Sequence, residues 1–307
     1  MKSAKTERRN PRTRGIDRKP TLDILRVLNG EDARVAGAVR RELPKIARAV
    51  DAIAAALQNG GRLIYVGAGT SGRQAVLDAA ECPPTFGTPH KVVQALIAGG
   101  ERALRLASED AEDSAANGAR ELRRAGMNRR DVVVGISASG TTPYVLGALQ
   151  FARRKGATTI AITSNPGAAV TRAANISIEP DTGPEAISGS TRMKAGTAQK
   201  MVLNMLSTAA MVRLGRVYDN WMIHLALTNG KLRRRGVQIL KEITGATASS
   251  AEHALRQVGH DLPAAIVMLK TGASARDARR SIKKTGGDVQ KAIEVAERTE
   301  RKVQGRR

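Results

Sequence analysis

The sequence predicts a three-layer α/β sandwich, with a parallel sheet flanked by helices, followed by a small helical bundle at the C-terminus. Short apolar runs alternate with helical patterns between residues 51 and 230, which is typical of a parallel sheet with helices on both faces. After residue 231 the periodicity stays helical to about residue 296. Gly245, Gly272 and Gly286-Gly287 interrupt it and indicate several short helices.

The N-terminal part is predicted to be helical and to form an arm over residues 1–50. Apolar residues recur at helical spacing through residues 21–58, and Thr21 or Asp23 can cap the first helix. Asn59-Gly60-Gly61 then ends the pattern.

Four apolar runs, with a weaker fifth, predict the strands of the sheet. They are residues 62–66, 93–97, 131–136, 158–162 and 174–178. Helices are expected between them from residue 73 to 80, 103 to 125 and 143 to 155, and a long apolar helix over 197–214. These patterns predict a sheet domain over 51–230, a bundle over 231–300 and a frayed basic tail over 301–307.

Composition excludes several classes of protein. The chain has 307 residues, a net charge of +23, one cysteine and four histidines in no metal-ligand spacing, so neither a disulfide framework nor a metal site is expected. No apolar run is long enough to span a membrane and the N-terminus has no signal-peptide core, so a cytoplasmic protein is expected. Most of the positive charge lies in residues 1–50 and 231–307, and aromatic residues are only 2%, so specific nucleic-acid binding is not expected.

Gly- and hydroxyl-rich loops follow three of the predicted strands, at residues 67–73, 137–142 and 164–167. In an open α/β sheet, ligands bind outside the carboxyl ends of the strands. Two of the loops lead directly into helices, so backbone N–H groups, hydroxyls and a positive helix end would converge on a phosphate without a metal. Ordinary Gly/Ser helix entries are the alternative interpretation.

Two carboxylates and one polar loop are further candidates. Glu81 precedes Cys82-Pro83-Pro84 at a predicted helix end, and Glu112 lies in an acidic cluster on a predicted helix. Paired carboxylates can act as general acid and base, although Glu112 could equally lie on a solvated helix face. The loop over residues 183–200 carries Arg192 and Lys194 and could close over a sugar or a phosphate, or it could simply be solvated.

At these residues the chain resembles the N-acetylmuramic acid 6-phosphate etherase family of the sugar isomerase (SIS) fold. The most specific match is Gly189-Ser-Thr-Arg-Met-Lys-Ala-Gly-Thr-Ala-Gln-Lys200. The other matching stretches are residues 6–10, 16–17, 29–32, 61–73, 77–85, 96–101, 111–114, 132–140 and 142–145. The C-terminal helices are similar to the small ubiquitin-associated-like bundle of that family.

The resemblance implies a cytoplasmic lyase that cleaves the D-lactyl ether of N-acetylmuramic acid 6-phosphate into N-acetylglucosamine 6-phosphate and D-lactate, in recycling of cell-wall amino sugars. The reaction eliminates lactate from C3 of the open-chain sugar and then adds water, with no metal and no cofactor. The catalytic glutamates of the family correspond to Glu81, which would protonate the departing oxygen, and Glu112, which would act at the C2 proton or the water. A homodimer with sites near the subunit interface is implied as well.

The resemblance also implies which residues bind the substrate and its phosphate: Thr70, Ser71, Ser137, Ser139, Thr141, Thr142, Ser190 and Lys194. The chain departs from the family pattern at three positions. Gly230 stands where a glutamate is usual, Pro20 where a serine is usual, and Thr141 where arginine is common.

Other functions remain open at this point. A non-catalytic sugar-phosphate sensor, similar to glucokinase regulatory protein, would share residues 189–200 and bind without turnover. A sugar-phosphate isomerase of the same fold would interconvert an aldose and a ketose and release no lactate. A nucleic-acid-binding regulator would show steep salt dependence of binding.

Overall fold

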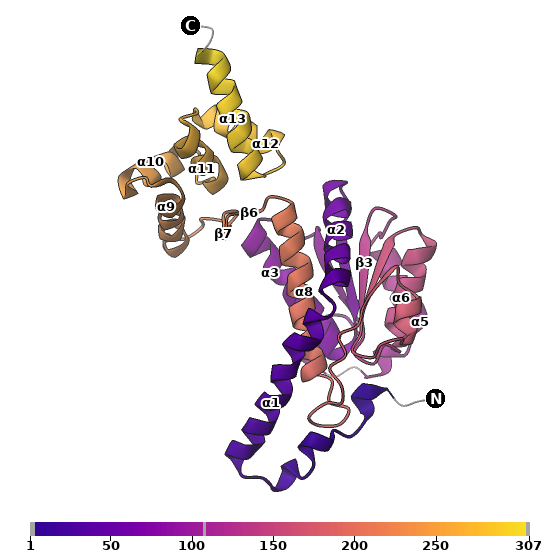
Figure 1. The fold of residues 1–307 in the computed structure, drawn as a ribbon. Helices are drawn as coiled ribbons and strands as arrows, with labels where there is room; N and C mark the ends of the chain where they lie inside the picture. Colours follow the sequence, from indigo (N-terminus) through magenta and orange to yellow (C-terminus); the bar gives the residue numbers. More distant parts are fainter. Residues whose placement is uncertain (1–3, 107–108, 305–307) are drawn as a thin grey trace. The chain divides into compact units, whose positions relative to one another are not determined.

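The structure, a computed structural model, describes residues 4–106 and 109–304 (Figure 1). The chain divides into two compact units, one of residues 1–80 and 89–210 and the other of residues 81–88 and 211–307. The first unit contains the sheet and the second contains the C-terminal helices. The domain boundaries expected after residues 50 and 230 stay predictions.

The first unit is built on a five-stranded parallel sheet in the order β2-β1-β3-β4-β5. Its strands are β1 (Leu63–Gly67), β2 (Val93–Ile97), β3 (Val132–Ile136), β4 (Thr158–Ile162) and β5 (Ile176–Ile178). Each coincides with a predicted strand to within two residues. In this strand order the direction of winding reverses between β1 and β3, and ligands of open α/β sheets bind at the carboxyl edge of such a point. The parallel sheet expected from the sequence is therefore confirmed.

Helices cover both faces of the sheet, which gives the three layers seen in Figure 1. The helices that follow or flank its strands are α2 (Leu43–Gln58), α3 (Gly69–Phe86), α5 (Ala115–Arg124), α6 (Pro143–Arg154), α7 (Ala169–Arg172) and α8 (Lys194–Arg213). Ile64 and Val66 of β1 pack with Tyr144 and Leu149 of α6. Tyr65 points to the opposite face, since successive strand residues alternate, and its hydroxyl meets Asp78 of α3.

The N-terminal arm begins with three short 3₁₀ turns, η1 (Lys5–Glu7), η2 (Pro11–Thr13) and η3 (Ile16–Arg18), and continues into α1 (Thr21–Arg40). The helices predicted over 21–58 are thus confirmed as α1 and α2. The predicted cap is wrong, because Pro20 occupies the N-cap position and no side chain caps α1. Leu22 and Leu25, one turn apart on α1, are exposed.

Two predicted helices differ from the structure. We expect a helix ending near Ala80, but α3 continues through Pro83 and Pro84 to Phe86. The helix expected over 103–125 is instead three pieces, α4 (Arg102–Arg105), the 3₁₀ turn η4 (Glu109–Glu112) and α5. Ser114 begins α5 by accepting a hydrogen bond from the N–H of Asn117 (3.2 Å), so the local cap separates α5 from the preceding turn.

In its described residues from 217 to 304, the second unit contains a small antiparallel hairpin followed by helices. They are β6 (Val217–Tyr218), β7 (Trp221–Met222), α9 (Gly230–Thr244), α10 (Ala248–Gln257), α11 (Leu262–Thr271), α12 (Ala275–Lys284) and α13 (Val289–Gln304). Gly245 and Gly272 end α9 and α11 in the left-handed conformation, as their positions predict. The helical bundle is confirmed, but α13 runs to Gln304, and residues 305–307 of the expected tail lie outside the described residues.

Candidate functional site

The two glycine-rich loops lie at the carboxyl edge of the sheet, on neighbouring strands. Residues 68–73 follow β1 and enter α3, and residues 137–142 follow β3 and enter α6. Because β1 and β3 are paired in parallel, both loops leave the sheet on the same edge, at the point where the winding reverses. The structure therefore brings both loops to the edge that the sequence argument requires, and ligand binding there stays a prediction.

The loop after β3 joins four hydroxyls into a connected series. The hydroxyls of Ser137 and Thr142 are 2.8 Å apart, those of Ser137 and Ser139 are 3.4 Å apart, and those of Ser139 and Thr141 are 3.1 Å apart. Ser137 is buried and accepts from the N–H of Gly140 (2.9 Å), whereas Thr141 is exposed. The structure thus brings together Ser137, Ser139, Thr141 and Thr142, with the outer members open to a ligand.

The loop ends at the first turn of α6, whose N-terminus is suited to an anion. Pro143 is the first helical residue, and Thr142 at the N-cap makes no side-chain capping hydrogen bond. The N–H groups of the first turn therefore have no side-chain partner from the cap, and the positive end of the helix dipole adds to them. Hydroxyls and backbone donors together make this loop a candidate phosphate site.

Residues that follow β4 hold the loop of residues 137–142 in place. The carbonyl of Ala138 accepts from Thr163 Oγ1 (3.2 Å) and from Asn165 Nδ2 (2.9 Å). Gly140 has φ +74°, and a Cβ placed on it would lie 2.3 Å from Cβ of Ala168 and 2.7 Å from Oγ1 of Thr163. A side chain at position 140 would therefore push the loop out of place.

The loop after β1 lies against the start of α8. Thr70 and Ser71 belong to the first turn of α3, and Ser71 is buried. A Cβ added to Gly196 of α8 would lie 3.4 Å from Cγ2 of Thr70, so the two helix starts are close neighbours. The structure therefore brings Thr70 and Ser71 beside the segment that follows Ser190 and Lys194.

The polar loop before α8 is anchored by carboxylates that the sequence argument missed. Glu185 accepts from the N–H groups of Lys194 and Ala195 (both 2.9 Å), so its carboxylate caps α8 and the helix starts three residues earlier than predicted. Lys194 is fully buried, and its ammonium is 2.6 Å from Oε2 of Glu31 on α1. Because Glu31 already neutralises this charge, direct contact of Lys194 with a phosphate stays a prediction.

Glu31 is the centre of a buried cluster that joins the N-terminal arm to this loop. Its carboxylate accepts from Asn10 Nδ2 (2.7 Å), from Lys194 and from the guanidinium of Arg12, whose Nη2 lies 3.0 Å away. The hydrogen bond from Arg12, with those from Lys194 and Asn10, outweighs burial and lowers the pKa of Glu31 to about 2. Glu31 therefore stays ionised well into the acid range.

The arm also contacts the loop directly. The carbonyl of Thr6 accepts from the N–H of Gly189 (3.3 Å), and the carbonyl of Glu7 accepts from Ser188 Oγ (3.1 Å). Thr6 Oγ1 in turn accepts from Asn165 Nδ2 (3.0 Å) at the end of β4. Residues 6–10, noted above only as a matching stretch, thus hold the loop of Ser190 beside the carboxyl edge of the sheet.

The two candidate catalytic glutamates are both exposed. Glu112 ends η4, a 3₁₀ turn rather than the expected helix, and this turn packs against α6. Glu81 lies inside α3 rather than at its end, and it is the first residue of the second compact unit. The catalytic roles of Glu81 and Glu112 stay predictions, as do the binding roles of the eight residues named with them.

Gly230, where the sequence departs from the family pattern, is the first residue of α9. Asn229 caps this helix by accepting from the N–H of Leu232 (2.9 Å), so helix α9 starts without the carboxylate that a glutamate would add. The departure leaves the local fold intact and changes only the charge of the first turn.

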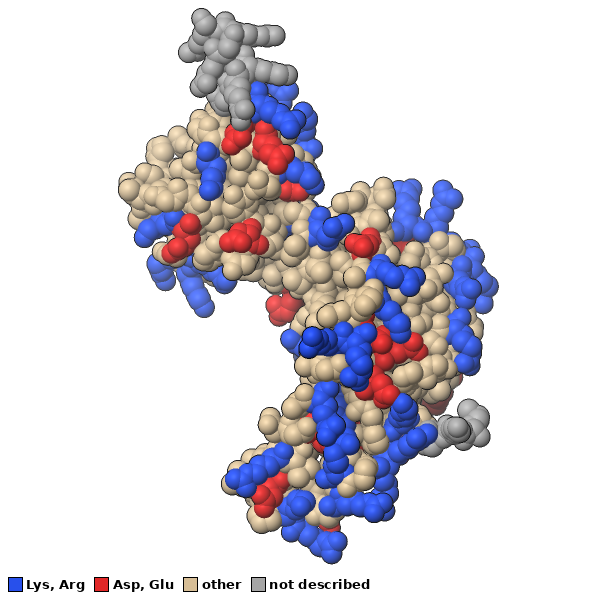
Figure 2. All heavy atoms as spheres, in the orientation of Figure 1, with Lys and Arg blue, Asp and Glu red and all other residues tan. Residues whose placement is uncertain are grey.

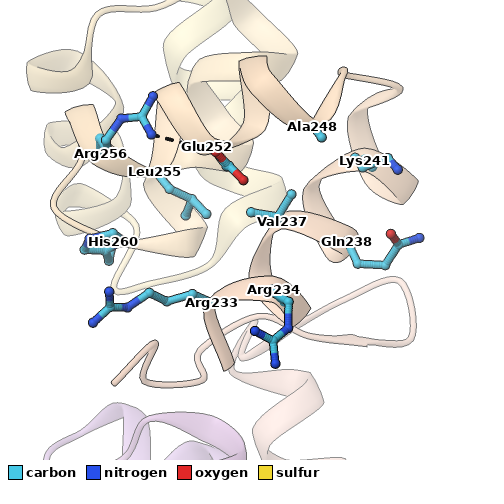
Figure 3. A pocket seen from close by; sticks show the side chains of 10 residues that line it. All are labelled: Arg233, Arg234, Val237, Gln238, Lys241, Ala248, Glu252, Leu255, Arg256 and His260. Carbon is cyan, nitrogen blue, oxygen red and sulfur yellow. Dashed lines mark ion pairs between the residues drawn. The ribbon is translucent and has the colours of Figure 1, made fainter. Parts of the chain in front are cut away.

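A separate hollow of about 550 Å³ lies between α9 and α10 of the second unit (Figure 3). Val237 and Leu255 give it an apolar floor, and Arg233, Arg234 and Lys241 come from its α9 side. None of the site residues predicted from the sequence lines it. The hollow is therefore distinct from the loops at the edge of the sheet.

The described part of the chain holds no group of three or more His, Cys, Asp or Glu side chains arranged to hold a metal ion. Among the helices of that part, none is long and apolar enough to cross a membrane. Lysine and arginine side chains cover much of the surface shown in Figure 2, in agreement with the net charge of +23.

Protein-family models match most of the sheet unit. A model of the glucokinase regulatory protein N-terminal SIS domain matches residues 45–153, and a model of the SIS domain matches residues 113–209. Together they cover both glycine-rich loops and the loop before α8. The SIS-type fold expected from the sequence is confirmed.

Curated relatives match nearly the whole chain. The N-acetylmuramic acid 6-phosphate etherase of Cronobacter sakazakii is 56% identical over 266 residues, which are 87% of this chain and 90% of the relative. The protein of the same name from Salmonella choleraesuis is 53% identical over the same coverage. Among solved structures, a putative phosphosugar isomerase from Bacteroides fragilis superposes with a TM-score of 0.51 at 17% identity. The superposition covers 67% of this chain and 98% of the isomerase chain, so the two proteins share the fold.

Proposed function

Because this chain belongs to the N-acetylmuramic acid 6-phosphate etherase family, we propose that it cleaves the D-lactyl ether of N-acetylmuramic acid 6-phosphate. The products are N-acetylglucosamine 6-phosphate and D-lactate, and the reaction serves amino sugar recycling. The observation that carries this proposal is the identity of more than half the residues to relatives of that name over 87% of the chain.

The proposed reaction is an elimination followed by an addition of water. The C1 aldehyde of the open-chain sugar acidifies the C2 proton, so a carboxylate is a strong enough base to remove it. The C3–O bond then breaks, and the lactate oxygen leaves with a proton supplied by a general acid. Water adds to C3 of the resulting enal and restores the sugar.

We propose that Glu81 protonates the departing lactate oxygen and that Glu112 acts at the C2 proton or at the water. Both side chains are exposed, so both can reach a substrate without the chain first unfolding locally. The elimination needs a base at the C2 proton and an acid at the departing lactate oxygen. Two carboxylates in opposite protonation states can supply one each.

The phosphate is assigned to the hydroxyls of residues 137–142 and to the N–H groups in the first turn of α6. Thr70, Ser71 and Ser190 are proposed to bind the rest of the sugar, since their segments lie side by side. No metal or cofactor takes part in the proposed reaction.

We also propose that the enzyme is a cytoplasmic homodimer, as the family resemblance implies. Leu22 and Leu25 support a subunit interface on α1, because these apolar side chains are 58% and 55% exposed on one side of the helix. Their burial by a second copy would remove this surface from water.

A second candidate is a sugar-phosphate-binding regulator. The match to the glucokinase regulatory protein SIS domain over residues 45–153 is the observation behind it, but the curated relatives named etherase do not favour it. Such a protein would bind the phosphate at the same loops but would not turn the substrate over. The presence of Glu81 and Glu112 favours the enzyme.

Isotope labelling tests the reaction and separates the candidates. With N-acetylmuramic acid 6-phosphate in H₂¹⁸O, we expect the label in N-acetylglucosamine 6-phosphate and none in D-lactate, because the C3–O bond breaks. Label in lactate would contradict the elimination. Binding without either product would indicate the regulator, and a ketose product without lactate would indicate an isomerase.

A further inference from the structure

Asp78 is a buried carboxylate in α3 that joins three elements of the sheet unit. Its side chain is 5% exposed and accepts hydrogen bonds from the Tyr65 hydroxyl (2.8 Å), Asn204 Nδ2 (2.8 Å) and Ser207 Oγ (3.0 Å). Tyr65 lies in the middle of β1, and the other two donors lie on α8. One carboxylate thus connects α3 to the strand before the first loop and to the helix after the loop of Ser190.

Helix α3 is weakened immediately after this point. Pro83 and Pro84 lie inside the helix and have no N–H, so the carbonyls of Ala79 and Ala80 cannot receive the usual helical hydrogen bonds. Glu81 lies between these carbonyls and the two prolines. The backbone that carries it is therefore held less firmly than the first turns of α3.

Asp78 and Glu81 lie close together on the helix. Residues three apart are neighbours on a helix surface, at about 60° around the axis from one another. The hydrogen bonds of Asp78 fix which side of α3 faces β1 and α8. They therefore also fix the direction in which Glu81 leaves the helix.

A buried carboxylate is a costly way to pack a helix. Desolvation of an ionised carboxylate costs several kcal/mol unless donors converge on it, and an apolar side chain would fill the same space without that cost. Burial raises the pKa of Asp78, and the three donors oppose this shift. Hydrogen bonds are directional, whereas apolar packing is not. The three donors to Asp78 therefore hold α3 in one defined orientation.

We propose that Asp78 is a positioning residue, which restrains the turn of α3 that carries Glu81 so that the Glu81 carboxyl meets the leaving lactate oxygen. This proposal rests on the proposed function. None of the three donors to Asp78 belongs to the phosphate loop, so Asp78 should affect turnover rather than binding.

The kinetic test compares two buried aspartates. Asp78→Asn keeps the volume but places an N–H₂ where a donor now points, and a misplaced acid should lower kcat by about tenfold to a hundredfold with KM within about twofold. Asp131→Asn is the matched control, since Asp131 is 1% exposed and bonded to Arg62 (2.7 Å) just before β3, at the opposite edge of the sheet. It should destabilise the protein and leave kcat within about twofold.

Hydrogen exchange tests the same restraint without any activity. Amides of residues 79–86 should exchange faster in Asp78→Asn than in the wild type or in Asp131→Asn. Tyr65→Phe removes only one donor, and it should shift exchange and kcat in the same direction by less. If Asp78→Asn fails to fold, Tyr65→Phe replaces it in both measurements.

Equal effects of Asp78→Asn and Asp131→Asn on kcat, or unchanged exchange over residues 79–86, would overturn the role of Asp78. A raised KM with unchanged kcat would overturn it too. A wild-type chain that releases no D-lactate would instead contradict the proposed function, and the exchange measurement would still report whether Asp78 restrains this part of α3.

Discussion

Replacing Glu31 by glutamine should destabilise the sheet unit by several kcal/mol, although Glu31 touches neither candidate catalytic residue. The substitution keeps the size of the side chain but removes its charge. The ammonium of Lys194, 0% exposed and 2.6 Å from Oε2 of Glu31, would then be buried without its ion-pair partner. Breaking a buried pair by removing one partner costs about 3–5 kcal/mol.

The pKa of Glu31 gives a second, independent magnitude. A pKa lowered from 4.5 to about 2 corresponds to about 3 kcal/mol of stability at neutral pH. Because the folded-state pKa is the lower one, this contribution is present above about pH 4.5 and is lost as the pH falls toward about 2. At pH 3 about 1 kcal/mol of it should remain.

Urea unfolding of the wild type and of Glu31→Gln at pH 7 and pH 3 measures both effects. We expect the difference in unfolding free energy to be about 3 kcal/mol at pH 7 and about 1 kcal/mol at pH 3. Asp23→Asn is the control, since its pair with Arg26 (3.0 Å) is exposed and should contribute less than about 1 kcal/mol. A difference below about 1 kcal/mol at pH 7, or one that does not change with pH, would refute the reasoning.

Three other predictions concern the loop and the proposed interface. Ser139→Ala should raise KM about tenfold with little change in kcat, because one hydrogen bond to a charged phosphate is lost. An unchanged KM in steady-state kinetics would show that Ser139 does not bind the phosphate. Gly140→Ala should lower the free energy of unfolding in urea by about 3 kcal/mol, because position 140 has a positive φ and the new Cβ would clash with Ala168. Gly167→Ala should lower it by only about 1 kcal/mol, because position 167 has φ +75° but open space around it. Equal losses in the two variants would contradict the clash. The double variant Leu22→Lys, Leu25→Lys should sediment as a monomer under conditions in which the wild type is a dimer, and a dimeric variant would exclude this face of α1.

The strands were predictable because each is a short apolar run, buried on both faces in a parallel sheet and bounded by glycine or polar residues. The ends of the helices were less predictable than the strands. Where the helix predicted over 103–125 is interrupted, the guanidinium of Arg73 donates to the carbonyls of Leu104 (3.2 Å) and Leu106 (3.1 Å) at the end of α4. That contact joins segments about thirty residues apart, which local patterns do not contain.

The site was predictable to a similar extent. The phosphate loop is local, since a strand is followed by six residues that hold a glycine and four hydroxyls, and its chemistry follows from that pattern. The Glu31 cluster was not predictable, because Asn10, Arg12 and Lys194 are 19 to 163 residues away from Glu31 and helix α1 carries ordinary-looking charges. The matching stretches 6–10, 29–32 and 189–200 contain Asn10, Glu31 and Lys194, but none of them indicates that these side chains meet.

The most direct test of the account is D-lactate release from N-acetylmuramic acid 6-phosphate by the wild type and by Glu81→Gln, with binding of the sugar phosphate measured for both. We predict that the wild type releases one D-lactate for each sugar consumed, and that Glu81→Gln binds the substrate equally well but loses most of its turnover. Release by Glu81→Gln at the wild-type rate, or binding without release by the wild type, would contradict it.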